Sequence, residues 1–292
     1  MLFDIYIPRD LVDASEFLYR NAPDAVPIAG GTDLIPMIRD GKLRPKYLVD
    51  LSGLKGRLSY VSIDSGVVRV GALTTINALG ASALTGMEAF LGFRDLYKTF
   101  GNAAVRSLAT VGGNVGTAVS AADLIVMFNA LDAKVGLSGV NGSRYVGIRE
   151  LVAGKRLLAK EPGELITEVV FNVPPKNSST AFIKLDYREG TIIGLISVAA
   201  LVTVRDGVIE DVKLAFDRVD RRVPGRAYLT EKGLKGVPLR DEAVGEVINE
   251  HLPREMRRKS DYRASGAYRL HVSKVLARRA VLTAGRRAVG GG

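Results

Sequence analysis

The chain of 292 residues contains no cysteine and no tryptophan, and its only histidines are His251 and His271. Without cysteine it can form no disulfide, no thiolate zinc site and no iron–sulfur cluster ligated by its own side chains. His271 lies in a basic segment rather than near carboxylates, which argues against a histidine metal site or a histidine general base. No metal site is expected, and any redox chemistry requires an organic cofactor.

Long apolar runs are also missing, although 47% of the residues are hydrophobic. No run approaches the roughly 18 to 20 uninterrupted apolar residues of a membrane-spanning helix. The N-terminus has no basic region that leads into an apolar core and a small-residue cleavage site, so export is not indicated. We therefore expect no membrane span and a cytoplasmic location.

The net charge of +10 is concentrated near the C-terminus. From residue 251 onward, eleven Lys and Arg stand against two acidic residues, whereas residues 1–250 hold thirty against twenty-nine. Such a segment can contact an acidic partner subunit, form a solvated face or bind nucleic acid. It contains no recognisable nucleic-acid-binding module, so we expect no nucleic acid and leave the first two interpretations open. The candidate docking residues are Arg254, Arg257, Arg258, Lys259, Arg263 and Arg269.

Two glycine-rich segments are the most informative features that the chain does contain. The first runs Ile28-Ala29-Gly30-Gly31-Thr32-Asp33-Leu34, and the second runs from Ala109 to Ala118 with Gly112, Gly113 and Gly116, followed by Asp123. Glycines between a strand and a helix allow close approach of a ligand, and helix N-termini favour phosphate. Two such segments predict a ligand with two phosphates.

Neither segment matches a common nucleotide-binding fingerprint. The spacing Gly-x-Gly-x-x-Gly is absent. The stretch Ala153-Gly154-Lys155-Arg156 is not a phosphate loop, because Arg149 stands where the first glycine belongs and Arg156 replaces the hydroxyl residue that binds magnesium. The two common nucleotide-binding folds are therefore disfavoured.

The predicted elements divide the chain near residues 174–179, where Pro-Pro and polar turn formers occur. Before that boundary we predict a helix over 11–20, strands over 25–29 and 47–51, and β-hairpins over 58–70 and 135–148. After it we predict strands over 182–185, 193–204 and 208–216, then helices over 242–250 and 262–283. The corresponding domains are 1–175, with lobes of about 1–53 and 54–175, and 178–284, followed by a flexible tail over 285–292.

Together these motifs resemble the FAD-binding subunit of molybdenum hydroxylases, a family that includes carbon monoxide dehydrogenase, aldehyde oxidoreductase and xanthine dehydrogenase. The resemblance covers nearly the whole chain, since Phe182-Ile183-Lys184 and the later Ser260-Asp261-Tyr262-Arg263 also look like that family. It implies an α+β fold: a two-lobed FAD-binding domain of the molybdopterin-dehydrogenase type, then a C-terminal domain with a three-stranded antiparallel sheet and helices.

The resemblance also implies which residues bind FAD. The first segment would wrap the pyrophosphate, Asp123 would bind the sugar-alcohol region, Phe100 would stack near the adenine, and Lys184 would stabilise an anionic reduced flavin. The complete set of implied FAD-binding residues is Ile28, Ala29, Gly30, Gly31, Thr32, Asp33, Leu34, Phe100, Ala109, Thr110, Gly113, Asn114, Thr117, Asp123, Ile166 and Lys184. No catalytic residue is implied in this chain.

The activity implied by the resemblance is electron transfer within a larger enzyme. A small subunit with two [2Fe–2S] clusters would reduce the FAD, a large subunit with molybdenum cofactor would oxidise the substrate, and the assembly would be a dimer of heterotrimers. The loop over 186–195 would border the flavin, and an external acceptor other than NAD is favoured because no Rossmann fingerprint occurs. A self-contained FAD oxidase and a non-enzymatic basic scaffold that binds a partner or RNA are the alternatives.

Overall fold

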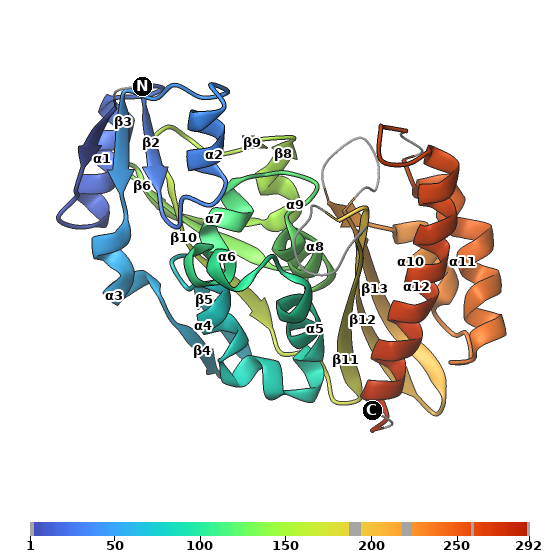
Figure 1. The fold of residues 1–292 in the computed structure, drawn as a ribbon. Helices are drawn as coiled ribbons and strands as arrows, with labels where there is room; N and C mark the ends of the chain where they lie inside the picture. Colours follow the sequence, from blue (N-terminus) through green and yellow to red (C-terminus); the bar gives the residue numbers. More distant parts are fainter. Residues whose placement is uncertain (1–2, 187–193, 218–223, 258–259, 291–292) are drawn as a thin grey trace.

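A computed structural model describes residues 3–186, 194–217, 224–257 and 260–290. The chain forms three consecutive units, which are arranged side by side in Figure 1. Each unit contains its own β-sheet, with strand orders β1-β3-β2, β4-β5-β10-β6-β7 and β11-β12-β13-β14, and a short β8-β9 hairpin is separate. The α+β fold class predicted from the sequence is confirmed.

The N-terminal lobe is a small parallel sheet with helices on it. Its elements are β1 (Asp4–Tyr6), α1 (Leu11–Arg20), β2 (Ala25–Ile28), α2 (Leu34–Arg39), β3 (Tyr47–Asp50) and α3 (Lys55–Leu58). Asp10 caps α1 by accepting a hydrogen bond from the Asp13 N–H. The predicted strands over 25–29 and 47–51 form as β2 and β3 and pair in parallel. Strand β1, which pairs in parallel with β3, was not predicted from the sequence.

The second lobe is an antiparallel sheet covered by short helices. Its elements are β4 (Val61–Asp64), β5 (Val67–Gly71), α4 (Ile76–Gly80), α5 (Leu91–Thr99), α6 (Ala103–Leu108), α7 (Val111–Gly116), α8 (Asp123–Ala130), β6 (Lys134–Gly139), β7 (Gly142–Gly147), α9 (Ile148–Leu151), β8 (Val152–Gly154), β9 (Leu157–Leu158) and β10 (Leu165–Asn172). Both predicted hairpins form. The rings of Phe90, Phe93, Phe128 and Phe171 contact one another in its core.

The C-terminal unit has a sheet that is buried on both faces. Its elements are β11 (Ser178–Leu185), β12 (Ile196–Arg205), β13 (Val208–Phe216), β14 (Gly225–Arg226), α10 (Tyr228–Leu234), α11 (Asp241–Glu255) and α12 (Gly266–Ala288). Along β12, Ala199 and Leu201 join the core of the second lobe, whereas Val198 and Ala200 join the core beneath α12. The sheet thus lies between α5 and α8 on one side and α12 on the other (Figure 1). The three predicted antiparallel strands form, and β14 adds a short fourth.

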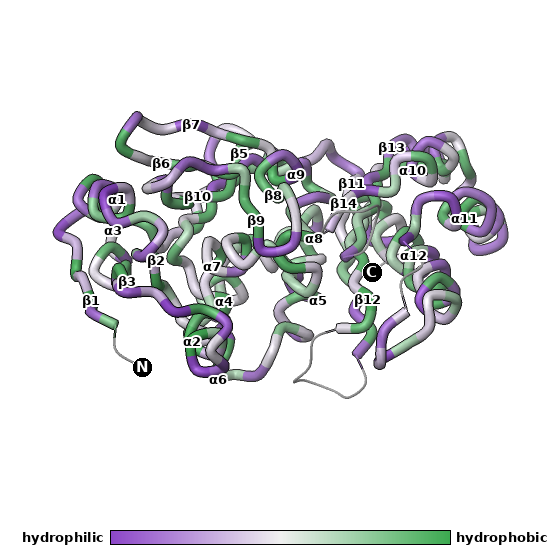
Figure 2. Tube along the Cα trace, turned by 90° about the horizontal axis from the view of Figure 1, so that it is seen from above, coloured by the Kyte–Doolittle hydropathy of each residue, from purple (hydrophilic) through white to green (hydrophobic). Residues whose placement is uncertain are grey.

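Helix α12 extends further than predicted. The expected end at residue 283 and the flexible tail over 285–292 are wrong for residues 285–288, which continue the helix. Arg287 explains the extension, because its guanidinium forms two hydrogen bonds of 2.6 and 3.0 Å with the Asp95 carboxylate on α5. Viewed from above, α1 and α11 lie at opposite ends of the molecule (Figure 2).

Candidate functional site

The two glycine segments lie directly against each other. A Cβ atom placed on Gly30 would be 1.9 Å from the carbonyl oxygen of Leu108 and 3.1 Å from the amide nitrogen of Ala109. Only glycine therefore allows the first segment to approach the start of the second so closely. The prediction that the segments contribute to one site requires this juxtaposition, which the sequence could not reveal.

The first segment presents a row of unused backbone donors. Within the described part of the chain, the N–H groups of residues 29–34 donate no hydrogen bond to another protein group. Gly31 makes the turn possible with φ +68°, in the left-handed region that favours glycine. Consecutive free amides at such a turn form a concave site for an anion. This segment has the chemistry to bind phosphate.

The N-terminus of α7, in the second segment, has a different character. The N–H groups of Val111 and Gly112 donate to the carbonyl oxygens of Thr74 and Ala72, and the Gly113 N–H donates to Thr110 Oγ1 at 3.0 Å. These amides are occupied, so the segment contributes little hydrogen-bonding capacity at its first turn. Gly113 and Gly116 are nevertheless exposed, and they provide a helix surface without side chains.

Asn114 connects α7 to α8. Its Oδ1 accepts a hydrogen bond of 3.1 Å from the Leu124 N–H. The residue before α8 is Ala122, which has no side-chain cap, so Asn114 caps α8 from a neighbouring helix. Thr117 Oγ1 donates to the Asn114 carbonyl oxygen at 2.8 Å. The predicted contacts of Thr110, Asn114 and Thr117 with FAD remain predictions, but all three side chains have structural roles of their own.

Asp123 and Lys184 form a buried ion pair between α8 and β11. The distance from Nζ to Oδ2 is 2.8 Å, and the two side chains are 5% and 6% exposed. Ser197 Oγ donates to the other carboxylate oxygen at 3.3 Å, and Asp186 Oδ2 lies 4.0 Å from the same ammonium. Burial raises the pKa of Asp123, and the Lys184 ammonium opposes that shift. Two predicted site residues that are far apart in the sequence thus meet where α8 of the second lobe packs near β11 of the C-terminal unit.

Ile166 lies next to the second glycine segment, whereas Phe100 is buried in the core of the second lobe. Ile166 on β10 lies beside α7, with Cδ1 3.9 Å from the position of a Cβ on Gly116. Phe100 is buried in the core of the second lobe with 7% exposure. Its stacking on an adenine ring stays a prediction. The predicted loop over 186–195 falls mostly on residues 187–193, which lie outside the described residues.

The basic C-terminal residues do not form a single exposed face. The Arg269 side chain is buried and donates to the Leu195 carbonyl oxygen at 3.0 Å and to Asp261 at 2.6 Å. Arg263 also pairs with Asp261, at 2.9 Å. Arg269 is therefore a core residue and the docking role expected for it is wrong, because burial removes its charge from the surface. Arg254 and Arg257 are exposed, and residues 258–259 lie outside the described part.

Arg156 is the residue near the glycine segments that sequence reasoning missed. Its guanidinium donates to both carboxylate oxygens of Asp33, at 2.7 and 3.2 Å. Its backbone N–H donates to the carbonyl oxygen of Ala118 at 2.7 Å. Asp33 begins α2 and Ala118 follows α7, so a single residue of the β8–β9 turn connects the two glycine segments. No local sequence pattern signals this role.

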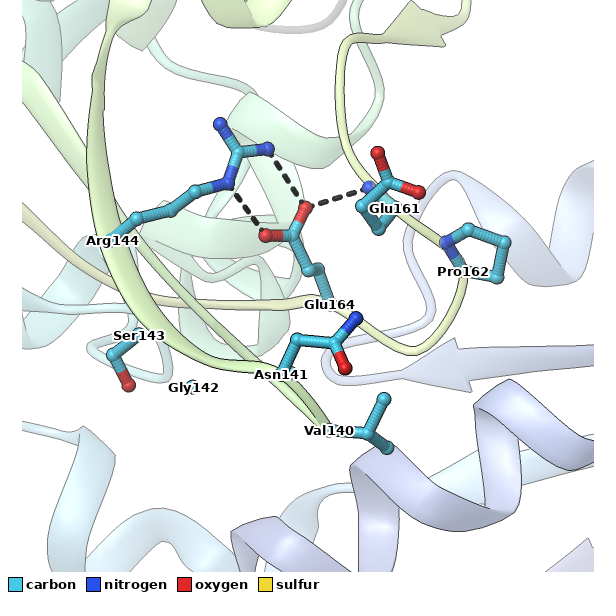
Figure 3. Close-up of a pocket in the computed structure, with 9 residues that line it drawn as sticks. Val140, Asn141, Gly142, Ser143, Arg144, Glu161, Pro162 and Glu164 are labelled. Carbon is cyan, nitrogen blue, oxygen red and sulfur yellow. Dashed lines mark hydrogen bonds and ion pairs between the residues drawn. The ribbon is translucent and has the colours of Figure 1, made fainter.

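A separate open cavity of about 200 Å³ lies beside the β6–β7 turn. Arg144 and Glu164 form two hydrogen bonds of 2.7 and 2.9 Å at its wall, and the Glu161 N–H donates to the same carboxylate (Figure 3). None of the predicted FAD-binding residues lines it. Because Arg144 and Glu164 at its wall already pair with each other, this cavity is not the candidate site.

Two further findings bear on the expectations from composition. Among the described residues, no group of three or more His, Asp or Glu side chains could hold a metal ion. No helix in the described ranges is long and apolar enough to cross a membrane.

Comparison with known families gives matches along most of the chain. A sequence model described as the FAD-binding domain in molybdopterin dehydrogenase matches residues 1–174. A second, described as the CO dehydrogenase flavoprotein C-terminal domain, matches residues 181–284. The first match covers all residues of both glycine segments.

Individual relatives agree with these matches. The glyceraldehyde dehydrogenase medium chain of Sulfolobus acidocaldarius is 32% identical over 272 residues, which cover 93% of this chain and 94% of the relative. The carbon monoxide dehydrogenase medium chain of Afipia carboxidovorans is 30% identical over 290 residues, covering 98% of both. A crystal structure of the Cu,Mo-CO dehydrogenase in its cyanide-inactivated form contains a chain that superposes with a TM-score of 0.91 at 29% identity, over 98% of this chain and 100% of that one.

Proposed function

The chain belongs to the family of FAD-binding subunits of molybdenum-dependent dehydrogenases, and we propose that it transfers electrons from an iron–sulfur partner through FAD to an external acceptor. As a member it is an FAD-binding component of an oxidoreductase. The electron path, the acceptor and the individual FAD-binding residues are the proposed part.

The observation that carries the proposal is the row of unused amides at residues 29–34, placed against the start of the second glycine segment. A pyrophosphate carries negative charge and several acceptor oxygens, which these donors suit. The exposed, side-chain-free face of α7 at Gly113 and Gly116 allows a large planar or extended ligand to lie close to the backbone. The residues present therefore fit an extended dinucleotide such as FAD.

The remaining residues divide the binding among separate parts of the cofactor. Residues 28–34 would hold the pyrophosphate through backbone amides. Asp123 would accept a hydrogen bond from the sugar-alcohol region, because an ionised carboxylate has only acceptors. Lys184 would place its positive charge beside the flavin, where it offsets negative charge. FAD would supply the ability to accept electrons one at a time from an iron–sulfur partner and to release them singly or as a pair, while the chain binds it and excludes water from the buried Asp123–Lys184 pair.

The partners follow from the chemistry that this chain lacks. With no cysteine the chain ligates no iron–sulfur cluster. Its similarity to the medium chains of molybdenum-dependent dehydrogenases supports a small subunit that carries the cluster and a large subunit that carries the molybdenum cofactor. A dimer of heterotrimers is the proposed assembly. The acceptor would be a quinone, a dye-like carrier or oxygen rather than NAD, since the sequence contains no Gly-x-Gly-x-x-Gly fingerprint.

Spectroscopy of the purified chain tests the proposal. A protein with bound flavin absorbs in the visible region, and it releases FAD when it is denatured. If no flavin is present even after incubation with FAD, the FAD-binding role is refuted. Bleaching of the flavin by a substrate in the chain alone would instead indicate a self-contained oxidase. Steady-state turnover of the co-purified complex with each acceptor then identifies the acceptor, and saturable NAD reduction would contradict our preference.

A further inference from the structure

We propose that Arg156 is a positioning residue for the pyrophosphate site: it pairs with Asp33 and so keeps the amides of the first glycine segment available to an anion. The inference rests on the proposed FAD-binding role of residues 28–34. It concerns how the protein's own charges are arranged around that site, and it assigns to Arg156 a role that no local motif indicates.

Asp33 precedes α2 but does not cap it. An Asp at this position ordinarily caps its helix by accepting a hydrogen bond from the second or third N–H of the helix. In α2 the third helical residue is Pro36, which has no N–H, and the Ile35 N–H donates to the Gly31 carbonyl oxygen. Asp33 accordingly makes no capping hydrogen bond. Its carboxylate turns to the Arg156 guanidinium instead, and the two hydrogen bonds measure 2.7 and 3.2 Å.

An unpaired carboxylate beside amides that bind phosphate would repel the phosphate and compete for the same donors. The bidentate guanidinium neutralises Asp33 and holds its oxygens in one orientation. Asp33 and Arg156 are about equally accessible, with side chains 40% and 39% exposed. A partly exposed pair contributes little to folding, so its main effect would fall on the neighbouring binding site.

The backbone of Arg156 adopts a conformation that is unusual for arginine. Its φ of +58° lies in the left-handed region, which is costly for any residue except glycine. The turn therefore carries an arginine where glycine would be more stable. The same residue fixes the end of α7 through its N–H, which donates to the Ala118 carbonyl oxygen. A substitution by glycine retains that N–H and the turn, and removes the side chain with its guanidinium.

Arg156→Gly in the full-length chain is the decisive variant. We expect its melting temperature without cofactor to equal or exceed that of the wild type, because glycine relieves the left-handed strain. We expect the Kd for FAD to rise about fivefold, the change that corresponds to about 1 kcal/mol. The Kd for riboflavin, which has no phosphate, should not change. Arg205→Ala, which breaks a surface pair of 2.7 Å with Glu210, is the matched control and should alter neither affinity.

A double variant distinguishes an effect of the Asp33 charge on FAD binding from a general disruption of the site. If Arg156 acts by neutralising Asp33, then Arg156→Gly combined with Asp33→Asn should bind FAD more tightly than Arg156→Gly alone. Additive losses, or equal weakening of FAD and riboflavin, would overturn the inference. Should the glycine variant not be recoverable, Arg156→Gln with and without Asp33→Asn makes the same comparison. Failure of the wild type to bind FAD would refute the proposed function itself, which is a different outcome.

Discussion

Substitution of Gly30 by alanine would place a methyl group against the backbone of the second glycine segment. The new Cβ would be 1.9 Å from the Leu108 carbonyl oxygen and 2.5 Å from its carbonyl carbon. Side-chain carbons essentially never approach another atom within 3.0 Å, so the segments must separate by at least 1.1 Å. The atoms nearest to this Cβ belong to the backbone of Leu108 and Ala109, which cannot rotate away as a flexible side chain can. The conflict is therefore resolved only by moving the two segments apart.

That displacement determines the expected magnitude. A hydrogen bond between an amide and a phosphate oxygen has a length near 2.9 Å and is lost when it is stretched by about 1 Å. Each hydrogen bond to a charged group contributes about 1.5–3 kcal/mol, so losing one weakens FAD binding roughly ten- to a hundredfold. Overpacking of this kind also lowers the free energy of unfolding by about 1–3 kcal/mol. We expect both effects in Gly30→Ala.

Titration of the cofactor-free chain with FAD, followed by flavin fluorescence, measures the affinity, and thermal unfolding measures the stability. Gly56→Ala is the matched control, because a Cβ on Gly56 meets nothing within 4 Å. The control should bind FAD as the wild type does and should be equally or slightly more stable. If Gly30→Ala binds FAD within twofold of the wild type, the close approach at Leu108 has no part in holding the site together.

Three further predictions concern separate parts of the second lobe. Gly113→Val should lose FAD, because it adds a branched side chain to the exposed face of α7, and full flavin content after purification would contradict this. Asn114→Ala should lower the free energy of unfolding by about 1 kcal/mol, since it removes the cap on the Leu124 N–H; an unchanged denaturant midpoint would refute that role. The Arg144 guanidinium holds the pKa of Glu164 below its usual value, so this pair stabilises the fold above about pH 4.3 and the contribution is lost as the pH falls. Glu164→Gln should therefore lower the melting temperature at pH 7, with a difference that narrows toward pH 3; a difference independent of pH would exclude an ionic origin.

Local patterns in the sequence were sufficient for many of the individual elements. The cap at Asp10, the strand–turn–helix unit around Gly31 and the hairpins of the second lobe depend on residues that are neighbours in the chain. The two glycine segments, with Asp123 and Lys184, also sufficed to identify the family. These signals are local because turns and caps are determined by the conformational preferences of a few adjacent residues.

Tertiary structure decided how these elements combine. The approach of Gly30 to Leu108 and the pairing of Asp33 with Arg156 join residues separated by many elements. The burial of Arg269 follows from the packing of α12 against the C-terminal sheet, so its charge does not contribute to the surface. Helix α12 likewise continues past residue 283 because the Arg287 guanidinium donates a hydrogen bond to Asp95 on α5. Such contacts depend on the relative placement of whole elements, and a one-dimensional pattern carries no information about which distant side chain will face another.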